Sequence, residues 1–278
     1  AVTSHGNYCV AWTYDNIVGV QMLEGADGSL LWDPTLQITE AILSDLVASD
    51  DGAVIALWVH PSGNNRHLYA QKYSAAGGSL WGSAPAVIYD GGSVGSNYFP
   101  TFVSDGAGGA VFGWSEATGA RNSYVQHIDA GGVELFPHNG VAASTLAGRV
   151  RSSPSVTYNS ATGDIFLFWV EENANQTGLY GQRFSPAGAR LWTEHGKELL
   201  PPSYQHKSNV RAVTYADGAM VFFLDDYLSP WILAMRVDSA GMSTWPGSPI
   251  VVGGGEFLDV DRTPSGMALI LARIRRSA

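Results

Sequence analysis

The stretch LYAQKYSAAGGSLWG (residues 68–82) occurs a second time, in recognisable form, as LYGQRFSPAGARLWT (residues 179–193). Both copies place Leu-Tyr-small-Gln before a basic and an aromatic residue, and Ser, Gly and Leu-Trp follow. Such self-similarity indicates either a chemistry that is used more than once or a structural unit that is built more than once. The spacing of the copies decides between the two.

The motif recurs five times when the chain is aligned on the Gln of this stretch. The aligned segments are VGVQML, LYAQKY, SYVQHI, LYGQRF and ILAMRV, and successive segments are 50, 55, 56 and 53 residues apart. An aromatic residue follows each of them, and a second apolar segment that ends in Trp, or in Leu224 for the fifth copy, precedes each of them. The aligned residues are Gln21, Gln71, Gln126, Gln182 and Met235; the following aromatic residues are Trp32, Trp81, Phe136, Trp192 and Trp245; the preceding Trp residues are Trp12, Trp58, Trp114 and Trp169.

Each repeat has the pattern of four short strands. In the third repeat we predict strands at residues 98–104, 110–114, 123–129 and 140–144, because these apolar and β-branched segments are separated by Gly- and Asp-rich turns. No window that is long enough for a helix shows a sustained period of 3.6 residues. The sequence therefore predicts an all-β protein.

A four-stranded antiparallel unit at this period is typical of the blade of a β-propeller. We predict one propeller domain over residues 1–278 with five blades, in which the C-terminal strand completes the first blade. The segment MALILARI (residues 267–274) is surplus to that closure, so a six-bladed ring and a fragment of a larger propeller remain alternatives. The predicted repeats are 1–40, 41–95, 96–150, 151–205 and 206–255, with a partial repeat at 256–278.

The turns before the fourth strands carry a resemblance to a known family. SAAGGSLW and SPAGARLW resemble the Asp-box of sialidases and related propellers, whose pattern is Ser-x-Asp-x-Gly-x-x-Trp, although Ala76 and Ala187 replace the Asp and only Asp27 keeps it. Because Asp-boxes are structural turns, the resemblance implies a propeller and no particular activity. The repeats are also similar to the Trp-rich repeat propellers of secreted bacterial proteins, which implies a secreted or cell-surface location.

Composition restricts the classes of partner. The formal net charge of −10 argues against nucleic acid, because phosphate binding needs a basic surface. The longest apolar runs are far too short to cross a bilayer. The single cysteine, Cys9, lies in the apolar run YCVAW and is predicted to be a small buried hydrophobic residue, with a reactive thiol as the alternative. We predict no cofactor.

Two groups of acidic residues are candidates for chemistry. Four acids lie on or beside first strands, which are innermost in a blade, and a glycoside hydrolase or lyase would need two such carboxylates across the central channel. The alternative is that these acids are turn residues. The four are Asp45, Asp217, Asp259 and Asp261.

A second group follows the second-strand Trp residues. Glu116, Glu171 and Asp226 stand two places beyond Trp114, Trp169 and Leu224, which is compatible with loop caps or with repeated binding positions. Asp225 with Asp226, or residues 171–173, could offer oxygen ligands to calcium, but the alternating acids of a calcium loop are missing. The seven histidines show no metal-binding spacing. We therefore predict no metal site.

The loops that differ between repeats are the best candidates for ligand binding. In a propeller, the loops between second and third strands and the loops between repeats emerge on the same face, and exposed aromatic residues beside Arg, His and Asn suit a sugar or a protein epitope. The hypothesis is a non-catalytic extracellular propeller that binds carbohydrate or a protein partner; a glycoside hydrolase or lyase and a structural module of a larger surface assembly are alternatives. The candidate ligand residues are Tyr98, Arg121, Arg149, Arg151, Tyr204, His206, Tyr227 and Trp231.

Overall fold

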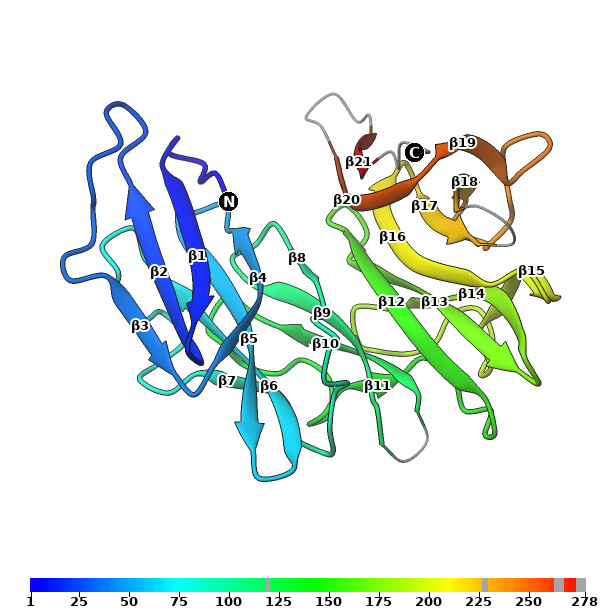
Figure 1. The fold of residues 1–278 in the computed structure, drawn as a ribbon, viewed down its shortest axis with the longest axis horizontal. Helices are drawn as coiled ribbons and strands as arrows, with labels where there is room; N and C mark the ends of the chain where they lie inside the picture. Colours follow the sequence, from blue (N-terminus) through cyan, green and yellow to red (C-terminus); the bar gives the residue numbers. More distant parts are fainter. Residues whose placement is uncertain (119–120, 227–229, 263–267, 274–278) are drawn as a thin grey trace, which may run out of the picture. The chain divides into compact units, whose positions relative to one another are not determined.

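The computed structural model describes residues 1–118, 121–226, 230–262 and 268–273, which form strands and turns without a helix (Figure 1). These residues accordingly contain no helix that could span a membrane. The chain divides into two compact units, whose boundary runs through the third sheet. Unit 1 comprises Ala1–Phe112, Glu116–Gly119 and Val125–Val141; unit 2 comprises Gly113–Ser115, Ala120–Tyr124 and Ala142–Ala278.

Every sheet is antiparallel, and its strands are neighbours in the order in which they occur along the chain. Four sheets have the predicted four strands, the first has three and the last has two. The first three sheets contain β1 (Tyr8–Tyr14), β2 (Ile17–Leu23) and β3 (Leu36–Thr39); β4 (Ile42–Ala48), β5 (Val54–Ser62), β6 (Asn65–Tyr73) and β7 (Ala86–Tyr89); and β8 (Phe102–Ser104), β9 (Ala110–Ser115), β10 (Ser123–Ile128) and β11 (Val141–Ala142).

The remaining three sheets belong to unit 2. β20 pairs with β21 in a two-stranded sheet, as the predicted partial repeat at the C-terminus requires. These sheets contain β12 (Val150–Asn159), β13 (Asp164–Asn173), β14 (Gln176–Phe184) and β15 (Lys197–Ser203); β16 (Lys207–Tyr215), β17 (Gly218–Asp225), β18 (Trp231–Val237) and β19 (Ile250–Gly254); and β20 (Glu256–Arg262) and β21 (Ala268–Arg273).

The recurring Gln is a buried clamp between the third strand and the turn that follows it. The side-chain oxygen of Gln71 accepts hydrogen bonds from the main-chain N–H groups of Lys72, at 2.9 Å, and Trp81, at 3.1 Å. Its amide donates to the carbonyl of Gly82 at 3.2 Å. Gln21, Gln126 and Gln182 make the same pair of bonds to the next residue and to the aromatic residue of the turn. The repeated motif is therefore architectural.

The aromatic residues after the clamp join successive sheets within a unit. The indole N–H of Trp32 donates to the carbonyl of Ala75, in the corresponding turn of the second sheet, at 2.8 Å. The indole of Trp192 donates likewise to Ser239 at 2.9 Å. Trp32, Trp81 and Phe136 are buried, whereas Trp192 and Trp245 are partly buried. Each turn is thus held both to its own strand and to its neighbour.

The second-strand Trp residues stack on the Tyr that lies two residues before the clamping Gln. Trp58 and Tyr69 are opposite each other in the ladder, with ring centroids 6.4 Å apart, and two further pairs repeat the contact. In the fifth sheet, Leu233 takes the place of the Tyr, because it lies two residues before Met235, the counterpart of the clamping Gln. Phe223 lies opposite Leu233 in the ladder. Phe223 therefore occupies the Trp position, which corrects the assignment to Leu224. The two further pairs are Trp114 with Tyr124 and Trp169 with Tyr180.

The first strands of successive sheets are neighbours, β4 with β8 in unit 1, and β12 with β16 and β16 with β20 in unit 2. Polar side chains connect them. The hydroxyl of Ser155 accepts the N–H of Ala212 at 2.9 Å, and Asp45 accepts the N–H of Phe102 at 3.4 Å in the same way. Asp45, one of the candidate catalytic acids, therefore connects two first strands.

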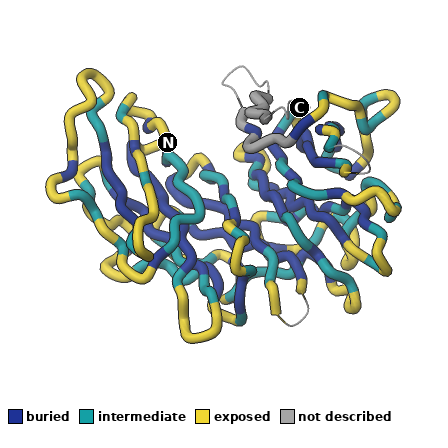
Figure 2. The backbone as a smooth tube through the Cα atoms, viewed as in Figure 1, coloured by how far each residue is buried: buried dark blue, intermediate teal, exposed yellow. Residues whose placement is uncertain are grey.

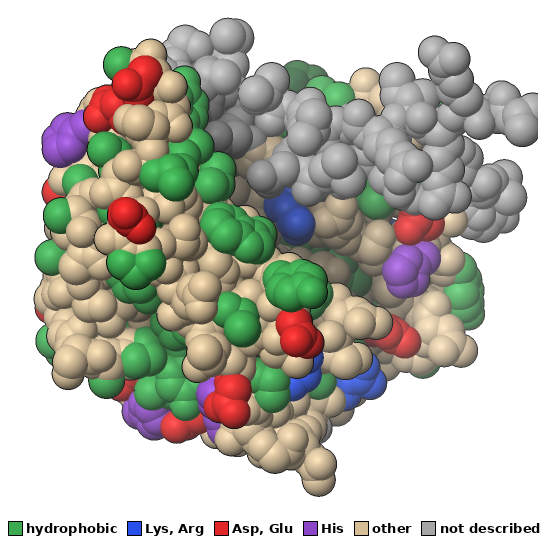
Figure 3. Space-filling model, turned by 60° about the vertical axis from the view of Figure 1, so that its left-hand side comes forward, with side chains coloured by type: hydrophobic (Ala, Val, Ile, Leu, Met, Phe, Trp, Pro, Cys, Tyr) green, Lys and Arg blue, Asp and Glu red, His purple; other side chains and the backbone are tan. Residues whose placement is uncertain are grey.

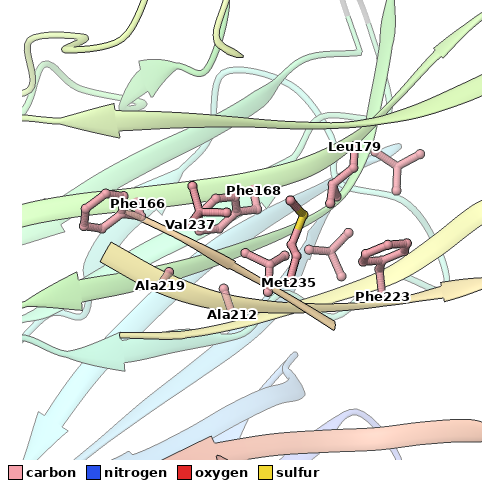
Figure 4. Packing of buried hydrophobic residues seen from close by; sticks show 11 residues of the cluster. Phe166, Phe168, Leu179, Ala212, Ala219, Phe223, Met235 and Val237 are labelled. Carbon is pink, nitrogen blue, oxygen red and sulfur yellow. The ribbon is translucent and has the colours of Figure 1, made fainter. Parts of the chain in front are cut away.

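Apolar side chains fill the space between facing sheets. Turns and loop tips are exposed, whereas the strands are largely buried (Figure 2). One such apolar layer in unit 2 lies between the fourth and fifth sheets, where Phe166, Phe168 and Leu179 meet Phe223 and Met235 (Figure 4). These strands are apolar at consecutive positions because both of their faces are covered. Sheets that pack face to face within each unit are what the propeller prediction requires.

Candidate functional site

The two classes of variable loops meet at one edge of each repeat. The carbonyl of Arg66, at the start of β6, accepts the N–H of Val94, which precedes the next first strand, at 3.0 Å. Arg121 and Arg151 repeat this bond at 2.9 Å, as do Pro230 and Gly255. We use the name loop rim for the part of this edge in unit 2 that consists of residues 121–122, 144–149, 173–177, 203–206, 225–226 and 230–231.

A buried Arg fixes the first part of the loop rim. Arg151 is 2% exposed, and its Nε lies 2.9 Å from Oε2 of Glu171, its ladder partner on β13. Its Nη2 donates to the hydroxyl of Ser144 at 3.0 Å and to the carbonyl of Leu146 at 2.8 Å. Burial lowers the pKa of Arg151, and Glu171 opposes that shift. Arg151 therefore lies beneath the surface and holds the 144–146 segment in place.

In the next repeat, the buried side chain of Lys207 holds the loop of residues 203–205 in place, as Arg151 holds residues 144–146. It is 4% exposed and lies opposite Asp225 in the ladder, as Arg151 lies opposite Glu171. Its Nζ donates to the hydroxyl of Ser203 at 2.8 Å and to the carbonyl of Gln205 at 3.4 Å. Burial lowers the pKa of Lys207, and Asp225 opposes the shift.

Sequence reasoning missed Lys207. The signal that would have revealed it is its place 56 residues after Arg151, opposite an acid. The register also shows that Asp225, rather than Asp226, is the fifth-sheet equivalent of Glu171, because Phe223 and not Leu224 occupies the Trp position. The acids two places beyond the aromatic residue therefore face a buried cation in both four-stranded sheets of unit 2.

Two more arginines lie beside the first of these pairs. Arg149 is partly exposed, with its Nε 3.8 Å from Oε1 of Glu171, so that Glu171 faces two guanidinium groups. Arg121 is exposed, and its carbonyl binds Arg151. The three predicted arginines thus come together on one edge of unit 2. Nearby, the hydroxyl of Tyr180 donates to Glu198 at 2.9 Å, and burial together with this carboxylate raises the pKa of Tyr180.

The loops before β16 and β18 form the second part of the loop rim. The N–H of Asp226 donates to the carbonyl of His206 at 2.9 Å, and Oδ2 of Asp226 accepts from the hydroxyl of Ser208 at 3.1 Å. The same oxygen lies 3.8 Å from Nδ1 of His206. The imidazole and Tyr204 are largely exposed.

Trp231 presents an indole on the second part of the loop rim. It opens β18 between Asp225 on β17 and Gly254 on β19. A Cβ on Gly254 would lie 3.7 Å from the indole, an ordinary van der Waals distance, so the ring lies against this part of β19. Trp231 is 49% exposed. Trp231, His206 and Tyr204 are thus presented by one set of hydrogen-bonded loops.

Two predicted ligand residues lie elsewhere. Tyr98 belongs to unit 1, where it is partly buried and its N–H donates to the carbonyl of Gly95 at 3.2 Å. Tyr227 lies outside the described residues. Among the candidate catalytic acids, Asp217 accepts the hydroxyl of Ser239 at 2.9 Å in an exposed turn, and the side chains of Asp259 and Asp261 lie outside the described part. Within the described residues, no group of three His, Cys, Asp or Glu could hold a metal ion.

No protein-family model matches the chain, and no curated protein matches it. Among solved structures it is similar to the fungal lectin of Aleuria aurantia, a six-bladed β-propeller with a fucose recognition mode, with 14% identity over 91% of this chain and 76% of that chain and a TM-score of 0.49. It is also similar to polysaccharide lyase Uly1, with 10% identity over 88% of this chain and 63% of that one and a TM-score of 0.49.

A eukaryotic initiation factor is similar at 10% identity over 97% of this chain, with a TM-score of 0.49. The chain spans 57% of the length of that factor and 38% of a similar prolyl endopeptidase. Because the identities are low and the TM-scores stay below 0.5, these likenesses assign neither a family nor an activity.

Proposed function

We propose that this protein is a non-catalytic extracellular propeller that binds carbohydrate through the loop rim of unit 2. The observation that carries the proposal is that half-exposed Trp231 pairs in the ladder with Asp225, next to Asp226, whose carboxylate lies 3.8 Å from the imidazole of His206. An aromatic face stacks on the apolar face of a sugar ring, while carboxylate and imidazole groups bond its hydroxyls. The two kinds of group that a sugar site needs are therefore presented together.

The buried side chain of Lys207 favours a binding role for the loop around Tyr204, because it fixes a loop that would otherwise be mobile in solvent. Lys207 fixes the carbonyl of Gln205 and the hydroxyl of Ser203, on either side of Tyr204. The hydroxyl of Thr177 also donates to Gln205 at 2.9 Å. A loop that is held in place before the ligand arrives loses less conformational entropy on binding, which favours affinity. This arrangement presents Tyr204 and His206 in fixed positions.

The fold proposal that accompanies this function is a propeller of five blades. The first sheet and the four sheets after it supply the five, and an added first strand would complete the blade of β1–β3. A secreted or cell-surface location follows from the similarity of the repeats to Trp-rich secreted propellers. We expect neither nucleic acid nor membrane lipid as a partner, given the net charge of −10.

A glycan array on the purified protein tests the carbohydrate proposal, followed by calorimetry with the sugar that binds best. We expect Trp231→Ala and Asp226→Asn each to weaken binding by at least about tenfold, or about 1.4 kcal/mol. Trp12→Ala is the matched control, because Trp12 is similarly exposed but belongs to unit 1. An empty array, or equal affinity for W231A and W12A, would contradict the proposal.

The same protein sample tests the enzymatic alternative. Hydrolysis of chromogenic glycosides, or release of unsaturated sugars from polysaccharides, would show that the protein is a hydrolase or lyase. We expect neither activity at protein concentrations that saturate the best glycan of the array. A measurable turnover would replace the binding proposal with the enzymatic one.

A further inference from the structure

The first part of the loop rim differs in charge from the rest of the chain. Its loop segments, residues 121–122, 144–149 and 173–177, contain two Arg and no Asp or Glu. The whole chain, in contrast, has 25 Asp and Glu against 15 Lys and Arg. On the surface shown in Figure 3, Asp and Glu side chains are scattered, and Lys and Arg side chains are visible at few places. An acidic protein therefore carries a basic segment on the edge where its variable loops meet.

The charges around Glu171 are not balanced. Its Oε2 lies 2.9 Å from Nε of Arg151, whereas its Oε1 lies 3.8 Å from Nε of Arg149, which is too long for a hydrogen bond. Burial lowers the pKa of Arg151, and the like charge of Arg149 adds to this effect. One carboxylate thus stands against two guanidinium groups.

Arg149 is presented by a segment that is already fixed. Its side chain is 32% exposed, whereas that of Arg151 is 1% exposed. Arg151 holds the 144–146 segment from beneath, and the N–H of Thr145 donates to the carbonyl of Glu194 at 2.9 Å. A guanidinium on a fixed segment loses less conformational entropy when it binds a ligand. Arg149 is therefore the exposed cation of the Glu171 cluster.

Arg121 supplies a second exposed guanidinium. The residue is exposed, and its carbonyl accepts the N–H of Arg151 at 2.9 Å, so that its main chain lies against the segment that carries the other two arginines. A further carboxylate, that of Glu198 on β15, accepts the hydroxyl of Tyr180 at 2.9 Å. Even with Glu198 counted, the arginines of this part outnumber its carboxylates.

The β13–β14 hairpin connects this part of the loop rim with the part that carries Trp231. Glu171 pairs with Gly178, the residue after Thr177. The hydroxyl of Thr177 donates to the carbonyl of Gln205 at 2.9 Å and accepts the N–H of Lys207 at 2.9 Å. The basic segment and the proposed sugar site are therefore successive parts of one hydrogen-bonded edge of unit 2.

We propose that the first part of the loop rim binds an oxyanion of the ligand, a carboxylate or a sulfate ester, through Arg149 and Arg121, and that the glycan is therefore acidic. A guanidinium presents parallel N–H groups that match two oxygens of such a group. A neutral sugar would leave the charge of Arg149 unmatched. This inference rests on the proposed carbohydrate site at Trp231 and names the class of its ligand.

Paired glycans test the inference by calorimetry. One pair is a uronic acid oligosaccharide and its carboxyl-reduced form, and the other is a sulfated oligosaccharide and its desulfated form. We expect the acidic member of one pair to bind at least about tenfold more tightly than its neutral member, and the pair that shows the preference identifies the oxyanion. The preference should shrink in high salt, because Arg149 and Arg121 are exposed.

Variants of the two arginines assign the preference to this place. Arg149→Gln and Arg121→Gln should each weaken the acidic glycan by at least about fivefold and leave its neutral form unchanged, which also shows that the variants are folded. Arg236→Gln is the matched control, because it removes the same charge from the other end of β18, away from the loop rim. It should bind both forms like wild type.

Two outcomes would overturn the inference without touching the carbohydrate proposal. One is equal affinity for the acidic and neutral members of both pairs while Trp231→Ala still weakens them. The other is an acidic preference that R149Q and R121Q leave intact. Loss of the carbohydrate proposal has a different signature, because W231A would then bind every glycan like wild type.

Discussion

The side-chain oxygen of Gln182 accepts the main-chain N–H of Trp192 at 3.1 Å, across ten residues of chain. The same oxygen accepts the N–H of Arg183 at 3.0 Å, and the amide donates to the carbonyl of Thr193. Gln182 is completely buried. One side chain thus satisfies three main-chain groups of a turn that no regular ladder reaches.

Replacement of Gln182 should lower the free energy of unfolding by more than the loss of a single hydrogen bond would, because its side chain bonds three main-chain groups. In Gln182→Ala, buried N–H and C=O groups lose their partners, and we expect a loss of about 2 to 4 kcal/mol in the free energy of unfolding. Denaturant titration measures the change. Gln205→Ala is the control, because Gln205 is exposed and uses only its main chain, and it should stay within about 0.5 kcal/mol of wild type. Equal midpoints for the two variants would refute the clamp.

The Arg151–Glu171 pair should show strong coupling. Arg151→Met leaves Glu171 as a buried charge with only the partly exposed Arg149 nearby, and we expect a loss of about 3 to 5 kcal/mol. The double variant R151M/E171L removes both charges and should recover much of that loss. A double-mutant cycle by urea unfolding measures the coupling; additive single effects would show that the pair does not hold the loop rim.

Acid should weaken the third sheet through Asp105. Burial disfavours the charge of Asp105, but hydrogen bonds from His127, Ala107 and Gly109 outweigh it and lower the pKa of this carboxyl. A carboxyl whose pKa is lower in the folded state stabilises the fold above its unfolded pKa of about 4, and the contribution is lost as the pH falls through the folded pKa. The Asp105→Asn variant should therefore have a lower free energy of unfolding than wild type at pH 7, and the difference should shrink towards pH 3. Urea unfolding at both pH values measures it. A difference that is independent of pH would contradict this.

Cys9 should be inert in the native protein. It is 2% exposed, and burial raises the pKa of its thiol to about 11, so little thiolate is present at pH 8. We expect alkylation by iodoacetamide, followed by mass spectrometry, to be at least a hundredfold slower in buffer than in urea. Comparable rates in the two conditions would show that the thiol is accessible.

The spacing between the Gln and the following aromatic residue was enough to predict the repeated sheets, because each Gln bonds to residues of its own repeat. Gln71 and Trp81 lie ten residues apart in the chain and bind each other directly, so the motif contains its own contact. The alignment went wrong by one residue at Leu224, where the run FFLD is buried on both faces and side-chain type cannot distinguish neighbouring positions. Only the ladder, which pairs Phe223 with Leu233, sets that register.

The candidate site was less predictable because its determinants are distant in sequence. Exposed aromatic residues in variable loops pointed to Tyr204 and Trp231, and both are exposed on the loop rim. The burial of Arg151 depends on Glu171 on another strand, and Lys207 gave no signal of its own because a single Lys before a strand is usually solvated.

The sequence by itself determined an all-β chain of repeated four-stranded units, since turn residues, alternation and the Gln-to-aromatic spacing are encoded within each repeat. The tertiary structure decided which charges and which aromatic side chains are buried. Burial depends on what the neighbouring strands and sheets cover. Trp12 and Trp58 hold the same place in their repeats, yet Trp58, which has β4 beside it and packs in the core between the first two sheets, is 4% exposed and Trp12 is 45% exposed.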